Sequence, residues 1–396
     1  MDLELTPGLR FDRATTPLLR TPHLLDATMF WRPGGGVHRV ISTKREVFTA
    51  SGWRHTLLAP GAVAPDGIDA GGLPIPASGG YRFVVARERA RRAIESVAPD
   101  IVEAADPYTL GWAVLDACQR LRVPAVAFCH SNLPALLARF VGGDGTPLGG
   151  FVERRARRYL AALYGRFDVV LAPSRAMVQE LADCGVPRAH HQPLGVDCSV
   201  FTPAACDPGW RIHLQARLGL PVGTRFIVYH GRFAPEKDLP LVAEAVRLLG
   251  PGHALLAVGA GPRVPEGQRV RVLPPEPDSG RLARLIASCD AAVHAGTQET
   301  FGLAALEALA CGTPLVASAE GGLGELVAEA GIAVHSRRPA DWAAALRAAL
   351  ALRGTALTTR GLQFARAHDW KRVLELLAAR YLRAMKQRRP AQQGGT

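Results

Sequence analysis

The stretch that decides the fold runs from residue 291 to residue 318 and reads AAVHAGTQETFGLAALEALACGTPLVAS. Its apolar start, residues 291–294, predicts a strand, residues 302–310 predict a helix, and residues 315–318 predict a second strand. A short strand, a helix and another short strand are typical of a βαβ unit. The strands of such a unit are parallel and buried on both faces.

The same alternation continues in both directions along the 396 residues. It predicts an α/β chain of two doubly wound, Rossmann-like domains, formed by residues 1–204 and 205–368. Residues 204–224 read as a linker region with one short helix. In this architecture ligands lie at the carboxyl ends of strands, so we expect the site in the cleft between the domains.

Apolar periodicity and turn residues set the other expected elements. Residues 1–22 read as an irregular lead-in and residues 60–80 as a loop. Ser174 is expected to cap the helix that follows it. The expected strands are 24–31, 55–59, 101–104, 124–130, 168–172, 226–230, 254–259 and 269–273, and the expected helices are 37–51, 87–97, 109–121, 151–164, 175–184, 238–249, 279–288 and 323–330.

Composition narrows the classes of protein. The seven cysteines are odd in number and lack CxxC spacing, which argues against a disulfide framework or zinc site and favours a reducing cytoplasm. Residues 1–13 do not read as a signal peptide, and no apolar stretch is long enough to span a bilayer. A net charge of +12 indicates an anionic partner, namely a phosphate ligand, a lipid surface or nucleic acid. A coding bias toward arginine would give the same charge without any function.

The segment from Glu299 to Glu307 carries the strongest chemical signal. The backbone amides of Phe301, Gly302 and Leu303 lie at the expected helix N-terminus, where free N–H groups and the helix dipole bind anions. A carboxylate on each side of a phosphate site suits the hydroxyl groups of a sugar nucleotide. The alternative is a surface helix with two solvated glutamates.

A second segment, residues 230–238, follows a strand directly and contains Arg232 and Lys237. Two cations fixed at a strand end stabilise the negative charge of a leaving diphosphate without a metal. The alternative is a pair of exposed basic residues in a loop.

Two weaker signals lie in the first half. Gly35 and Gly36 belong to a glycine triplet at a strand-to-helix turn, where the backbone can approach a phosphate or a sugar closely. A plain flexible loop explains the triplet equally well. His130 ends the strand at 124–130, and a lone histidine is more often structural than catalytic.

Taken together, these segments resemble glycosyltransferase family 4, the large retaining family of the GT-B fold. The resemblance covers most of the chain and is strongest from about Asp168 to Glu325. It rests on the order and spacing of several pieces: Gly34-Gly35 with Arg39, His130, residues 172–174, 194–197 and Phe201, Gly231-Arg232 through Glu236-Lys237, Glu299 and Glu307, residues 311–317, and Gly321-Gly322.

The resemblance implies two facing domains with a deep cleft, a closing helix at 369–390 that crosses back to the first domain, and retention of anomeric configuration without a metal. One departure is Asp238, which stands where the family usually has a glycine after the lysine. By position, the implied roles are the donor diphosphate for Arg232 and Lys237, the transferred sugar for Glu299, the ribose for Glu307, the phosphates and acceptor for Gly35 and Gly36, and the transition state for His130.

The resemblance is closest to bacterial mannosyltransferases that use GDP-mannose, and a UDP-glucose-type donor stays open. The implied partners are the nucleotide sugar and a glycan or lipid-linked acceptor, with no nucleic acid. Residues 153–158 form a basic stretch that either docks on anionic lipid at the inner membrane face or is a solvated helix face. The rival classes are a sugar-nucleotide epimerase, an NAD-dependent oxidoreductase and an inactive binding module. The oxidoreductase lacks its fingerprint, because no acidic residue ends the strand at 55–59.

Overall fold

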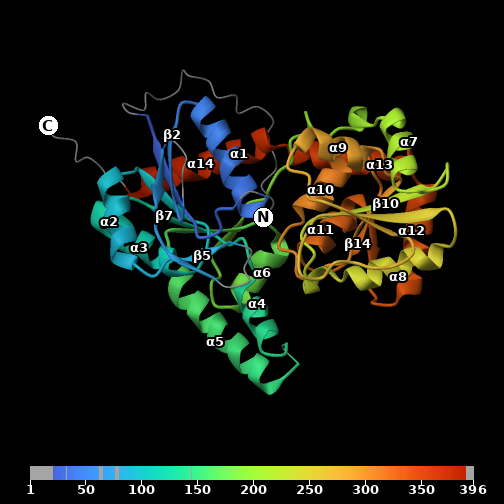
Figure 1. Ribbon diagram of the computed structural model, residues 1–396. Coiled ribbons are helices and arrows are strands. Elements are labelled where there is room, and N and C mark those ends of the chain that lie inside the picture. The colour runs from blue at the N-terminus through green and yellow to red at the C-terminus, as the bar shows by residue number, and fades with distance from the viewer. Residues whose placement is uncertain (1–20, 33, 62–65, 76–79, 144, 389–396) are drawn as a thin grey trace.

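The structure is a computed structural model, and it describes residues 21–32, 34–61, 66–75, 80–143 and 145–388. The described residues form two large parallel sheets, each covered by helices on both faces, and a short antiparallel pair (Figure 1). Residues 1–20 of the expected lead-in and 389–390 of the expected closing helix lie outside the described residues.

The first sheet is parallel, with the strand order β3-β2-β1-β6-β7-β8-β9. Its central strands are buried along their whole length, as expected for short apolar strands between two helical layers. The strands are β1 (His23–Ala27), β2 (Arg54–Ala59), β3 (Gly67–Asp69), β6 (Ile101–Ala104), β7 (Ala125–Phe128), β8 (Val169–Ala172) and β9 (Ala189–His191).

The second sheet is also parallel, with the order β12-β11-β10-β13-β14-β15. In both sheets the order reverses beside the first strand, β1 or β10, which is the doubly wound pattern and places ligands at the carboxyl ends of the strands there. The strands are β10 (Arg225–His230), β11 (His253–Val258), β12 (Val270–Leu273), β13 (Ala291–His294), β14 (Leu315–Ser318) and β15 (Ile332–Val334), and the antiparallel pair is β4 (Leu73–Pro74) with β5 (Arg82–Phe83).

The helices of the first half are α1 (Gly36–Ala50), α2 (Arg87–Val97), α3 (Thr109–Leu121), α4 (Leu133–Phe140), α5 (Pro147–Tyr164) and α6 (Arg175–Asp183). Those that follow are α7 (Pro208–Arg217), α8 (Leu239–Leu249), α9 (Ser279–Ala287), α10 (Leu303–Ala310), α11 (Gly321–Ala330), α12 (Pro339–Ala351), α13 (Ala356–Ala367) and α14 (Trp370–Arg388), with short 3-10 turns at η1 (Pro203–Ala205) and η2 (Pro235–Lys237).

The structure confirms most expected elements, including the linker helix, which is α7, and the Ser174 cap, whose hydroxyl accepts from the Met177 amide at 3.2 Å. Several expectations were wrong in extent, among them the strand at 124–130, which stops at Phe128 and leaves His130 beyond its end. The first strand stops at Ala27 rather than residue 31, residues 67–69 of the expected loop add an edge strand, and α5 begins at Pro147 rather than 151. Pro147 favours that earlier start because it is preorganised for the first turn of a helix.

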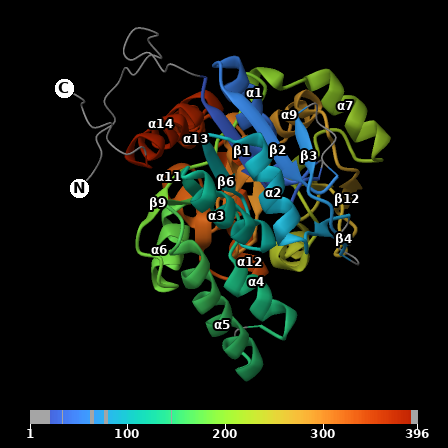
Figure 2. The same ribbon diagram turned by 90° about the vertical axis from the view of Figure 1, so that its left-hand side faces the viewer.

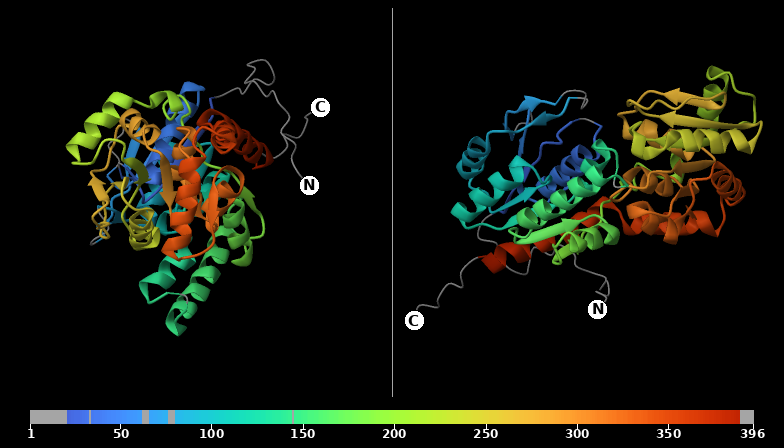
Figure 3. Two further views of the ribbon diagram at one scale, coloured as in Figure 1. Left: turned by 90° about the vertical axis from the view of Figure 1, so that its right-hand side faces the viewer. Right: turned by 90° about the horizontal axis from the view of Figure 1, so that it is seen from below.

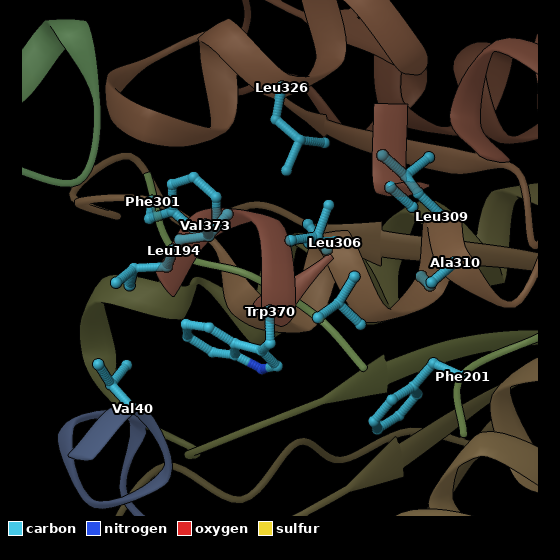
Figure 4. Packing of buried hydrophobic residues seen from close by; sticks show 14 of the residues in the cluster. Val40, Leu194, Phe201, Phe301, Leu306, Leu309, Ala310, Leu326, Trp370 and Val373 are labelled. Atoms are coloured by element: carbon cyan, nitrogen blue, oxygen red, sulfur yellow. The ribbon is translucent and has the colours of Figure 1, made fainter. Parts of the chain in front are cut away.

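The closing helix α14 crosses from the second half and packs along the first sheet and α1 (Figures 1 and 3). Trp370 begins it and lies in an apolar cluster with Leu194, Leu306 and Val373 (Figure 4). A side chain at Gly195 would come 2.8 Å from the Trp370 ring, so glycine is required for this close approach.

A cluster of charged and polar groups lies inside the first half. The Lys44 ammonium donates to Asp26 and Glu103, at 2.6 Å each, and His55 Nε2 lies 2.7 Å from Asp26. Tyr381 of α14 donates its hydroxyl to the other oxygen of Glu103. All five side chains are buried, so α14 completes a hydrogen-bonded network within the first core as well as apolar packing.

Burial lowers the pKa of Lys44, but the charges of Asp26 and Glu103 outweigh it and hold that pKa above its ordinary value. Burial raises the pKa of Asp26, but Lys44 and His55 outweigh it, so the pKa of this carboxyl lies below its ordinary value. Burial together with the Asp26 charge raises the pKa of Glu103. The cluster therefore centres on an ionised Lys44–Asp26 pair.

Helices α4 and α5 pack against each other as a hairpin that projects from the first half, away from both sheets (Figures 1 and 2). Among the helices of the described residues, we find none long and apolar enough to cross a membrane.

Candidate functional site

Lys237 and Glu299 form an ion pair at the carboxyl ends of β10 and β13, the point where the strand order of the second sheet reverses. Lys237 ends the η2 turn, and Glu299 lies in the loop between β13 and α10. Burial opposes ionisation of Glu299, but the Lys237 charge and hydrogen bond outweigh it and hold the pKa of that carboxyl below its ordinary value. The site thus contains a fixed cation and a fixed carboxylate.

The N-terminus of α10 follows this pair directly. Gly302 is the N-cap and Leu303 the first helical residue, so the first amides of α10 have no carbonyl partner within the helix. The Gly322 amide donates to the Glu299 carbonyl at 2.7 Å, which holds the loop before α10 against α11. Phe301 is buried in the apolar cluster and anchors the same loop. The structure therefore brings together the expected anion site of residues 301–303 and Glu299.

Glu307 lies one turn further along α10 and is buried. Its carboxylate accepts from His230 Nε2 at 2.9 Å and from the guanidinium of Arg39, which belongs to α1 of the first half. Because burial lowers the pKa of His230 well below its ordinary value, the neutral ring must carry its proton on Nε2 to donate it. Glu307 is therefore held in a fixed orientation by both halves.

Arg232 and Lys237 contact different carboxylates. The Arg232 side chain is 69% exposed and donates to Glu236 at 2.6 Å. Glu236 also accepts from Arg139 of α4 at 3.0 Å, so this carboxylate links the two halves. The expected cations are both at the site, but each is paired with its own carboxylate.

The glycine turn of the first half faces α10. A side chain at Gly36 would meet the Leu303 side chain at 3.8 Å, so the start of α1 lies against the start of α10. Gly35 is the N-cap of α1 and accepts from the Arg39 amide at 3.0 Å through its carbonyl. The two helix N-termini that the sequence singled out therefore lie against each other where the two halves meet.

His130 follows β7 and also reaches this region. Its carbonyl accepts from the Thr300 hydroxyl at 3.1 Å, and its ring stacks on Phe128 with 4.3 Å between centroids. Burial lowers the pKa of His130 to about 3, so the ring is neutral at ordinary pH. Among the described residues its buried Nε2 has no hydrogen-bond partner.

Asp238 adopts the left-handed conformation, with a φ of +46°, and its carboxylate pairs with Arg337. The departure from the family pattern therefore keeps the backbone that glycine would adopt, and aspartate is among the residues that tolerate it best. Helix α8 begins normally at Leu239.

A cavity of about 320 Å³ opens beside these groups. It is lined by Arg139 from the first half and by residues of the second half, namely Pro235, Glu236, Thr297, Gln298, Glu320 and Arg337. The cavity therefore shares Arg139 and Glu236 with the contact that links the halves.

Sequence reasoning missed the residues that join the halves. Arg139 and Thr300 were assigned no contact, and the part played by His230 and Arg39 in holding Glu307 was not foreseen. These partners lie far apart in the chain, up to 268 residues for Arg39 and Glu307. A histidine at the end of a central strand was a weak signal for His230, and no comparable signal marks Arg139.

Two family models match the chain. A model described as Glycosyltransferase Family 4 matches residues 34–200, and a model described as Glycosyl transferases group 1 matches residues 211–360.

Two relatives come from Mycobacterium tuberculosis. A GDP-mannose-dependent alpha-mannosyltransferase is 32% identical over 244 residues, which cover 60% of this chain and 60% of that protein. The match thus spans about three fifths of that relative's length. A GDP-mannose-dependent alpha-(1-6)-phosphatidylinositol dimannoside mannosyltransferase is 30% identical over 346 residues, which cover 80% of this chain and 85% of that protein.

Among solved structures, the Anabaena protein HepE in complex with UDP-glucose superposes with a TM-score of 0.72 and 18% identity. The match covers 91% of this chain and 99% of that structure. At this identity the likeness shows a shared fold.

Proposed function

The chain belongs to glycosyltransferase family 4, and from that premise we propose that it transfers mannose from GDP-mannose to a glycan or lipid-linked acceptor, with retention and without a metal. The expected GT-B fold is confirmed. The name of a mycobacterial relative supports a nucleotide sugar as the donor. The observation that carries the proposal is the Lys237–Glu299 ion pair beside the N-terminus of α10, between residues 62 positions apart in the chain.

In this proposal the donor diphosphate lies against the free amides at the start of α10, with Lys237 and Arg232 as cations. Both cations then exchange a carboxylate partner for phosphate oxygens. Glu299, released from Lys237, accepts hydrogen bonds from the transferred sugar. Glu307 accepts from the ribose hydroxyls, and the His230 contact keeps its carboxylate turned for that purpose.

The transition state resembles an oxocarbenium ion, in which the bond from the anomeric carbon to the diphosphate lengthens as the acceptor oxygen approaches on the same face. The acceptor proton passes to the leaving phosphate oxygen, so no enzymatic base is needed, and direct attack on the same face needs no enzymatic nucleophile. His130 offers its unpartnered Nε2 to the sugar. A neutral ring suits this role, because a cation there would oppose the developing positive charge of the sugar.

The GDP-mannose donor is proposed from the names of the two mycobacterial relatives. One of those names also includes a phosphatidylinositol dimannoside, which supports a lipid-linked acceptor and a cytoplasmic enzyme with peripheral contact at the inner membrane face. A UDP-sugar donor of the UDP-glucose type is the alternative.

We also propose the domain division at residue 205, with a hinge in residues 200–224 and where α14 begins. The linker helix α7 and the Val196–Asp369 bridge lie at these two places.

The test is saturation-transfer NMR on the full chain with matched GDP- and UDP-sugars, followed by transfer assays in excess EDTA. We expect the strongest saturation for GDP-mannose, undiminished turnover with EDTA and an α-linked product. A chain that binds no nucleotide sugar would overturn the proposed function. Turnover that disappears with EDTA and returns with Mg²⁺ or Mn²⁺ would overturn the metal-free mechanism alone.

A further inference from the structure

Large apolar side chains are exposed at the projecting end of the α4–α5 hairpin. Phe140, the last residue of α4, is 78% exposed, and Leu148 and Phe151 in the first two turns of α5 are 58% and 55% exposed. Leu137 lies one turn before Phe140 on α4 and is also exposed. A cluster of large apolar side chains at the end of a projection marks a surface that binds something apolar. These four residues are called the apolar tip below.

Positively charged side chains lie on α5 next to the apolar tip. Residues 133–164 contain five arginines, with only Asp144 and Glu153 as acidic residues in their sequence. Glu153 is paired with Arg157 at 2.8 Å, whereas Arg154, Arg155 and Arg158 are exposed. Within the described part of the chain, we find no ion pair of Arg154, Arg155 or Arg158, so the hairpin presents three exposed cations there.

Helix geometry places these arginines behind the apolar tip on one face of α5. Phe151 lies three, four and seven residues before Arg154, Arg155 and Arg158, which are the spacings of a single helix face. With a rise of 1.5 Å per residue, the arginines lie about 9 Å behind the centre of Leu148 and Phe151 along the helix axis. That separation matches the depth, about 5–10 Å, to which apolar side chains enter the boundary of headgroups and acyl chains.

We propose that the α4–α5 hairpin docks end-on in an anionic lipid bilayer. The apolar tip enters the acyl boundary while Arg154, Arg155 and Arg158 bind lipid phosphates. The occupant is a bilayer because the surface is a small apolar end with three cations behind it on one helix face. A protein groove of ordinary interface size would bury much more apolar area than this tip offers. The inference deepens the peripheral membrane contact of the proposed function, because it names the docking element and can be tested without donor or acceptor.

Docking has a consequence for the acceptor that rests on the proposed function. Arg139 adjoins Phe140 in α4 and lines the cavity at the contact between the halves. A docked hairpin therefore holds that cavity close to the bilayer surface, where a lipid-linked sugar reaches it without leaving the membrane.

The experiment is flotation of the full chain with vesicles of phosphatidylcholine alone or in an equimolar mixture with phosphatidylglycerol. We expect binding to the anionic vesicles that weakens as salt is added. Phe140→Ser with Phe151→Ser should reduce that binding by at least about tenfold, because each phenyl ring loses its transfer into the apolar boundary. Arg154→Gln, Arg155→Gln and Arg158→Gln together should abolish the preference for anionic vesicles.

The matched control is Ile212→Ser with Val222→Ser, which removes two exposed apolar side chains of the second half and should leave flotation unchanged. Thermal unfolding and donor binding should be the same in all variants, which separates loss of docking from loss of the fold. Equal flotation of wild type and the apolar-tip variant overturns the proposal. A concentration-dependent dimer that the apolar-tip variant abolishes, without vesicle binding, also overturns it and identifies a second copy as the occupant. Failure of transfer with intact flotation would instead count against the proposed function.

Discussion

The two halves share one strand order and differ in where they keep their charge. In the first half, Lys44 and its carboxylate partners lie inside the core, beneath α14. In the second half, the corresponding region between sheet and helices is apolar, and Lys237 and Glu299 lie at the strand ends. The same topology therefore uses ion pairs in two places, one beneath a crossing helix and one at the candidate site.

The largest effect expected from this comparison is on stability. Lys44→Met leaves the buried Asp26 and Glu103 carboxylates without their cation, so we expect a loss of about 3–5 kcal/mol in the free energy of unfolding. Urea denaturation followed by tryptophan fluorescence measures it. The control is Glu103→Gln, which should cost only about 1 kcal/mol because the pKa of Glu103 is already raised. Equal losses in both variants would mean that the cluster is not organised around Lys44.

The second effect should appear in turnover and not in stability. Glu299→Ala and Lys237→Ala are each expected to lower the transfer rate at least about a hundredfold, since one lost electrostatic contact to the transition state is worth about 3 kcal/mol. Melting temperatures should stay close to the wild-type value. Arg247→Ala, which breaks an exposed ion pair with Glu244 in the same half, should change neither quantity. Near-normal turnover of either site variant would contradict the site assignment.

The third effect is a loss of stability as the pH falls. Burial lowers the pKa of His294 to about 4, below the ordinary 6.5, so the unfolded chain binds this proton first as pH falls. The contribution of neutral His294 to the free energy of unfolding is therefore fully present above about pH 6.5 and is lost as pH falls toward 4. By pH 5 the loss should reach about 2 kcal/mol, at 1.36 kcal/mol per pH unit.

Urea denaturation at several pH values tests this, with His294→Asn as the comparison, since asparagine has no such proton to bind. The variant should lose less stability than wild type between pH 7 and pH 5. Parallel pH profiles for the two proteins would show that His294 is protonated in the folded state.

The smallest effect is on stability and comes from the backbone just before the helix that follows the first strand of each half, α1 or α8. A left-handed residue precedes it in both, Gly34 with a φ of +82° before α1 and Asp238 with a φ of +46° before α8. We expect Asp238→Ala to destabilise the protein by about 1 kcal/mol, because alanine lacks the polar side chain that makes this backbone tolerable. Asp238→Gly should lie within about 0.5 kcal/mol of wild type, as relief of the backbone offsets the lost pair with Arg337. Thermal unfolding that ranks the two variants equally would show that the conformation carries no cost.

The sequence predicted the architecture because its strands are short, apolar and bounded by turn residues. The strands 101–104, 291–294 and 315–318 and the helices 87–97 and 109–121 have the expected limits. The elements not foreseen have weaker patterns. Helix α12 is rich in alanine, and helix α13 lacks a sharp apolar face. The edge strands β9 and β15 have only three residues each.

The candidate site divides in the same way. Sequence could single out Lys237, Glu299, Glu307 and the start of α10 as candidates, because each belongs to a short motif. The ion pairs between the halves could not be predicted from sequence. The pairing of Arg39 with Glu307, or of Arg139 with Glu236, depends on how the two domains face each other. No local pattern encodes that contact, and it is long-range in sequence for every pair involved.

Helix α14 also sets the order in which the first half can be completed. Tyr381 and Trp370 follow both halves in the sequence, so they leave the ribosome after them, yet Tyr381 bonds Glu103 inside the half that emerges first. The first half therefore has an open seam beside α1 until α14 has been synthesised and has packed there. We expect a chain stopped before residue 370 to leave that seam unsealed, with Glu103 deprived of the Tyr381 hydroxyl.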